Sequence, residues 1–228
     1  LNCNGDKNYN NEVVYTNVIS GAGEVQVGSS SSLVSGRVRF TAENVYTGTT
    51  KAWMESVGAF GLDIPGAIPD YSKFTCTGGR TSLVLPEGDS PWTEVAVARL
   101  ANEATWEEGA AISFDTDART DKTVVWTGSE PITNAEAILA AEHGTTLEVR
   151  GVHPDSCNGY AIYGAATLKF STKDPLPFPT FKVVQLKGGM AGDCFRVAFD
   201  GAPYVQLPSN VVSVGVADME TRMVVSNS

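Results

Sequence analysis

Positive charge, histidine and long apolar runs are all scarce in this chain of 228 residues. It carries 16 Lys and Arg against 26 Asp and Glu, so its formal net charge is -10. Proteins that bind nucleic acid through its phosphates need a clustered positive surface, which makes direct nucleic-acid binding doubtful. No apolar run approaches the ~18 residues that a membrane-spanning helix requires, so we expect no membrane insertion. With two histidines, metal and acid–base chemistry would depend mainly on carboxylates.

Familiar catalytic and redox motifs are also missing. The sequence has no Gly-x-Ser-x-Gly nucleophile motif, no Gly-x-x-x-x-Gly-Lys phosphate loop and no Cys-x-x-Cys pair. We therefore expect no catalytic centre and no cofactor. The cysteines lie far apart, and both two disulfides and four reduced thiols remain open. They are Cys3, Cys76, Cys157 and Cys194.

One acidic turn is the candidate metal site. Asp115, Asp117 and Asp121 lie within seven residues of one another. Three carboxylates in a turn can bind a hard cation such as Ca2+. The glycine and the final glutamate of an EF-hand loop are absent, so a solvated acidic loop is the alternative interpretation.

Carboxylates also flank one aromatic residue. Glu103, Glu107 and Glu108 surround Trp106 in the sequence. Acids beside an aromatic ring occur in sites that bind or cleave sugars, where the two carboxyl groups must lie at a set distance. The alternative is that the tryptophans anchor the core or an interface.

The chain is rich in alternation with a period of two residues, which is typical of β-strands. Within residues 35–45 this alternation places Val38 and Phe40 on one face of a strand. Strand-like segments recur at short intervals, roughly ten in all, which indicates a sandwich or a barrel. They cover residues 11–20, 35–45, 81–85, 110–114, 122–126, 145–150, 160–170, 180–186, 194–199, 203–207 and 211–225.

Two segments have helical features. Thr133 and Glu136 form a capping box, which predicts a helix that begins at Thr133 and stops at Gly144. Residues 94–100 alternate like a strand, although the following apolar positions also suit a helix. We favour a strand there, followed by an irregular turn or a short helix. No internal repeat is visible, so we expect one domain over residues 1–228 with extended termini.

Three stretches follow one another in an order found in a known family. Trp106–Phe114 has an aromatic residue, then a glycine, then a strand. A polar loop, Pro131, the capped helix and the strand Thr145–Arg150 come next. Cys194–Pro208 then forms a strand that bends at an Asp-Gly pair and ends in a proline. This order is similar to that of the jelly-roll coat proteins of small icosahedral RNA viruses, particularly the picornavirus-like group.

The resemblance implies an all-β fold, an antiparallel two-sheet jelly-roll sandwich with one or two short helices. It implies a non-enzymatic capsid subunit of a virion, which tiles against copies of itself or sibling coat subunits and can meet a host receptor or glycan. Two alternatives remain open. One is a secreted carbohydrate-binding β-sandwich. The other is an extracellular filament subunit in which a segment such as Glu12–Ser20 adds a strand to the next copy.

Overall fold

Most of the described chain is β-strand. The computed structural model describes residues 12–29, 31, 36–54, 58–107, 110–142, 144–150, 160–163 and 166–171. Of residues 162, 169–171, 181–185, 194–199, 211–216 and 222–227 it describes the backbone but not the side chains. The strand predicted over residues 203–207 lies outside these ranges.

The strands form three sheets, and strands that follow one another along the chain lie in different sheets over β1 to β14. The nine-stranded sheet contains, in spatial order, β1 (Glu12–Tyr15), β3 (Arg37–Phe40), β5 (Ala59–Leu62), β7 (Arg80–Val84), β9 (Ala111–Asp115), β11 (Leu139–Ala141), β13 (Tyr160–Tyr163), β16 (Cys194–Phe199) and β15 (Phe181–Gln185). The four-stranded sheet contains β2 (Val25–Val27), β4 (Thr50–Trp53), β6 (Phe74–Thr77) and β8 (Thr105–Trp106). The five-stranded sheet contains β10 (Thr123–Trp126), β12 (Thr146–Arg150), β14 (Thr167–Ser171), β18 (Arg222–Asn227) and β17 (Val211–Val216).

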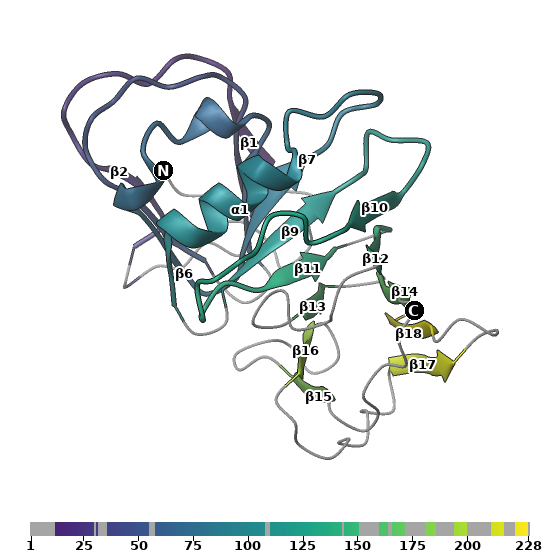
Figure 1. Ribbon diagram of the computed structural model, residues 1–228. Helices are drawn as coiled ribbons and strands as arrows, with labels where there is room; N and C mark the ends of the chain where they lie inside the picture. Colours follow the sequence, from purple (N-terminus) through teal and green to yellow (C-terminus); the bar gives the residue numbers. More distant parts are fainter. Residues whose placement is uncertain are drawn as a thin grey trace.

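This alternation makes the chain a β-solenoid. Each turn leaves the nine-stranded sheet, forms a strand in one of the other two sheets and returns parallel to the strand where it began. A turn takes roughly 20 to 30 residues, the length expected for such repeats. Colour follows the sequence in Figure 1. Purple at β1, teal at β9 and green at β14 succeed one another across the molecule, since each turn lies beside the one before it.

The prediction of an antiparallel two-sheet jelly-roll sandwich is therefore wrong. All pairings among β1 to β14 are parallel. Antiparallel pairing is described only where β15 to β18 join the sheets. Parallel strands cannot be joined by a tight hairpin, so the chain must return to the same end of the sheet before it pairs again. Here a strand in another sheet supplies that return path.

The larger hydrophobic core lies between the sheets, and the predicted orientation of Val38 and Phe40 is confirmed. In the central strands β5, β7, β9 and β11 both faces are buried, so burial does not alternate there. Val38 and Phe40 both point inward and are fully buried. A line of rings, which we call the aromatic chain, crosses the interior from the nine-stranded sheet to the four-stranded sheet. Its ring centroids are separated by 5.7 Å (Tyr15 to Phe40), 4.9 Å (Phe40 to Phe60), 6.0 Å (Phe60 to Phe74) and 5.8 Å (Phe74 to Trp106).

The one α-helix of the described residues, α1 (Glu94–Glu103), lies where we favoured a strand. The Thr93 hydroxyl caps it by accepting the N–H of Ala96 at 3.3 Å. Its buried side chains follow helical spacing and face the core. They are Val97, Ala98, Leu100 and Ala101. Two short 3-10 helices, η1 (Pro65–Ala67) and η2 (Tyr71–Lys73), precede it, and no helix in the described ranges is long and apolar enough to cross a membrane.

The helix predicted to begin at Thr133 does not form, and β11 occupies part of its range. A neighbouring residue, Asn134, caps the end of α1 instead. The Asn134 side-chain amide donates to the carbonyls of Ala101 at 3.1 Å and Ala104 at 3.0 Å, at the end of α1. The side-chain oxygen of Asn102 accepts the N–H groups of Thr133 at 2.8 Å and Asn134 at 3.2 Å. The polar sequence therefore caps a helix that ends about thirty residues earlier in the chain.

Candidate functional site

Charged side chains cluster on the outer face of the nine-stranded sheet. Arg37 and Arg39 point outward because they alternate with the core residues Val38 and Phe40. The other charged residues come from β1, β7 and β9 and from the positions directly after β5 and β11. We call the group the outer charge cluster: Glu12, Arg37, Arg39, Asp63, Arg80, Asp115 and Glu142. Of these residues only Asp115 was among the candidates predicted from the sequence, because the others lie far apart along the chain.

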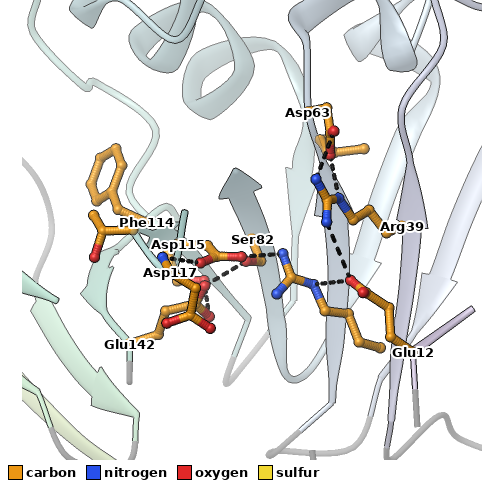
Figure 2. Close-up of polar contacts among 12 residues, drawn as sticks. Glu12, Arg39, Asp63, Ser82, Phe114, Asp115, Asp117 and Glu142 are labelled. Carbon is orange, nitrogen blue, oxygen red and sulfur yellow. Dashed lines mark hydrogen bonds and ion pairs between the residues drawn. The ribbon is translucent and has the colours of Figure 1, made fainter. Parts of the chain in front are cut away.

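One half of the outer charge cluster is partly exposed. Arg39 donates two hydrogen bonds to the Asp63 carboxylate, at 2.5 Å from Nε and 2.8 Å from Nη2. Glu12 lies beside both arginines, with Oε1 3.1 Å from Arg37 Nε and 3.9 Å from Arg39 Nη1 (Figure 2). The hydrogen bonds to Asp63 raise the pKa of Arg39 above its ordinary value, so this guanidinium is a permanent cation.

The other half is buried. Arg80 is 2% exposed and Glu142 is 5% exposed, and Arg80 Nε donates to Glu142 Oε2 at 2.6 Å. The hydroxyls of Ser82 and Ser113 donate to the same carboxylate at 2.6 Å and 3.1 Å. The hydrogen bond between Ser82 and Glu142 is drawn in Figure 2. A buried charge pair requires such additional hydrogen bonds, and these tie three successive turns together.

Arg37 also forms an ion pair with Asp115 on β9, and the other carboxylate oxygen of Asp115 accepts the N–H of Asp117 at 2.8 Å. The partners belong to β3 and β9, and β5 and β7 lie between those strands. Gly61 on β5 leaves the necessary space. A Cβ atom there would lie 3.0 Å from Arg37 Nε and 3.2 Å from Arg39 Cβ. A larger residue at this position would therefore displace the arginine side chains.

The geometry gives no support to a cation site at Asp115, Asp117 and Asp121. Asp115 faces the guanidinium of Arg37, which repels a cation. Asp121 accepts the N–H of Thr123 at 2.8 Å, and that hydrogen bond lowers the pKa of Asp121. Among the residues that the structure describes, no three His, Cys, Asp or Glu side chains are placed to hold a metal ion.

The acids around Trp106 do not surround an exposed ring. Trp106 is buried in the core, and its indole N–H donates to the carbonyl of Ala101 at 3.0 Å. Glu103 accepts a hydrogen bond from Arg99 at 2.9 Å on the exposed side of α1. Glu108 lies outside the described residues. The ring therefore acts as a core anchor, the alternative that the sequence left open.

Cys76 is a free, buried thiol on β6. Burial raises its pKa to about 12, so the thiolate that reacts with oxidants or metals is disfavoured. Two disulfides would require all four cysteines, so that alternative does not fit this structure. Cys3 and Cys157 lie outside the described residues.

In the part of the chain that the structure describes, the first turn of the solenoid presents an open edge. In the described ranges β1 ends the nine-stranded sheet, and β2 ends the four-stranded sheet at the same turn. Val13 is in register with Val38, which is in register with Phe60. These two partners are 0% exposed, whereas Val13 is 39% exposed although it occupies the same core position. The core is therefore open to solvent at this end of the described chain.

Other exposed valines gather near the same end. Val14 is 43% exposed, Val18 58% and Val45 61%. An apolar residue exposed at the open edge of a sheet is a ready site for pairing with another strand. The outer charge cluster is paired internally, so the first turn is the stronger candidate for recognition. No family model matches this chain, and neither a curated protein nor a solved structure does.

Proposed function

We propose that this protein is an assembly subunit that docks through the first turn of its solenoid. The exposure of Val13 at a core position is the observation that carries the proposal. Covering that position removes apolar surface from water, which contributes about 25 cal/mol for each Å² buried. A partner strand beside β1 would also satisfy the peptide groups along its edge.

The predicted role of a structural subunit is retained, but its contact with other subunits is now placed at the first turn of a solenoid instead of on a jelly roll. Of the earlier alternatives, strand addition through Glu12–Ser20 is the one that the open edge of β1 favours. The icosahedral shell and the virion location stay predictions. They depended on a resemblance to jelly-roll coat proteins, and the parallel solenoid is not a jelly roll. Carbohydrate binding also stays a prediction, but the β-sandwich fold predicted with it is absent from the described part of the chain.

The wild-type chain should form oligomers whose population rises with concentration, as measured by sedimentation velocity. Val18→Lys should shift the distribution toward monomer, because it places an ammonium group among the exposed valines of the first turn. Val95→Lys on α1 is the matched control, since Val95 is 59% exposed and Val18 is 58% exposed. We expect the control to assemble like the wild type.

Two results would decide against docking by the first turn. One is a wild-type chain that remains monomeric at its highest soluble concentration. The other is an equal loss of assembly in the Val18→Lys and Val95→Lys variants. Closed particles of many copies would instead favour a shell, and growing fibres would favour a filament.

A further inference from the structure

The open edge of β1 is complementary to itself. We propose that its partner is a second copy of this chain, related by a two-fold axis that passes through Val14 perpendicular to the nine-stranded sheet. This inference rests on the proposed function, because it names the partner that the first turn binds.

The direction of the peptide groups selects Val14 as the centre. The carbonyl of Tyr15 accepts the N–H of Thr41 at 3.1 Å, so the peptide groups of Tyr15 face β3. Successive residues of a strand direct their peptide groups to opposite sides. Those of Glu12, Val14 and Thr16 therefore face away from β3, toward the side on which the described residues place no further strand.

Antiparallel pairing about Val14 supplies hydrogen-bond partners for these peptide groups. Val14 lies opposite the same residue of the second copy, and the two exchange a pair of hydrogen bonds. Glu12 lies opposite Thr16 in the same way. Because the axis is perpendicular to the sheet, the core side of one copy continues into the core side of the other. Val13 therefore meets Tyr15, and both occupy core positions.

Charge also permits this register. Glu12 lies opposite a threonine, and the two Glu12 residues are four positions apart along the strands, about 13 Å. Each Glu12 carboxylate is already 3.1 Å from the guanidinium of its own Arg37. A second copy fits this end better than a single peptide does, because the first turn ends two sheets, with β1 in one and β2 in the other. A two-fold contact is closed, so the expected product is a dimer.

A charge exchange at Val14 tests the axis. Val14→Lys and Val14→Glu each place two like charges opposite one another, and each should weaken the dimer at least about tenfold. An equimolar mixture places Lys opposite Glu and should restore the dimer, as measured by sedimentation equilibrium. Val95→Lys and Val95→Glu, alone or mixed, should leave the wild-type dimer constant unchanged. Recovery on mixing also shows that both variants are folded.

A cysteine at the same position gives a second measurement. The Cα atoms of a hydrogen-bonded antiparallel pair lie about 5.5 Å apart, within the range of a disulfide. Val14→Cys should therefore cross-link to itself under mild oxidation, and peptide mass mapping should identify the linkage. Val95→Cys should not form a dimer linked at its new cysteine.

The possible outcomes separate this inference from the proposed function. A wild type that dimerises, with no recovery on mixing and no linkage at position 14, would show that the axis is wrong while docking by the first turn stands. A monomeric wild type would overturn both. Recovery on mixing together with the linkage at position 14 supports both.

Discussion

At the residue scale, the side chains that matter most for the outer face are charged residues with distant partners. Arg37 and Asp115 are 78 residues apart in the sequence, and Arg80 and Glu142 are 62 apart. Asp115 has two acidic neighbours in its turn, which suggested a cation site. Its actual partner is an arginine from another turn of the solenoid. A local pattern cannot reveal such a pair, because the pairing depends on which strands lie side by side.

Replacing Glu142 with glutamine should strongly destabilise the protein. The change leaves the buried guanidinium of Arg80 without this counter-charge, and the expected loss in the free energy of unfolding is about 3–5 kcal/mol. Urea unfolding followed by circular dichroism measures it. Glu103→Gln is the control, because its partner Arg99 is exposed and such pairs contribute at most about 1 kcal/mol. Equal losses in the two variants would contradict a buried structural pair.

At the element scale, the sequence located some strands but missed β2, β4, β5, β6, β8 and β11, and it placed both helical segments wrongly. The predicted ranges of β3, β7, β9, β10 and β12 agree with the structure to within a few residues. Alternation marked β3, and apolar runs bounded by turn residues marked β7 and β9. The polar residues from Thr133 to Glu136 match a helix start equally well whether they cap their own helix or a neighbouring one. Only the packing of α1 against residues 127–134 decides between the two.

The end of α1 provides a test at this scale. Asn134→Ala removes the hydrogen bonds to the last carbonyls of α1, and we expect a loss of about 1 kcal/mol in stability. Glu136→Ala should have little effect, because the capping box that would use Glu136 does not form. Thermal unfolding of both variants measures the difference. A large effect of Glu136→Ala with none for Asn134→Ala would restore the originally predicted helix.

At the scale of the whole molecule, one core joins the sheets. The aromatic chain connects the nine-stranded sheet to the four-stranded sheet through Phe60 and Phe74. A solenoid is stabilised by contacts between neighbouring turns, so damage at a central turn affects turns on both sides.

Phe60→Ala should therefore weaken the entire fold. Loss of the ring leaves a cavity at a fully buried position, and the expected cost is about 3–5 kcal/mol. Urea unfolding followed by tryptophan fluorescence and by circular dichroism should give one coincident transition. Val95→Ala, at an exposed position, should change stability by less than about 0.5 kcal/mol. Two separate transitions in Phe60→Ala would show that the sheets do not share one cooperative core.

The sequence by itself determined that Val38 and Phe40 share one face of a strand, because alternation between the two faces is a local property of a strand. It also determined the high strand content and the scarcity of positive charge. It did not determine whether neighbouring strands run parallel or antiparallel, since both arrangements produce the same alternation. Insertion of α1 between β7 and β8 makes the turns unequal, which hides the repeat from a search for a fixed period. Tertiary structure alone decided the solenoid, the long-range ion pairs and the open edge of β1, because each depends on which turns lie side by side.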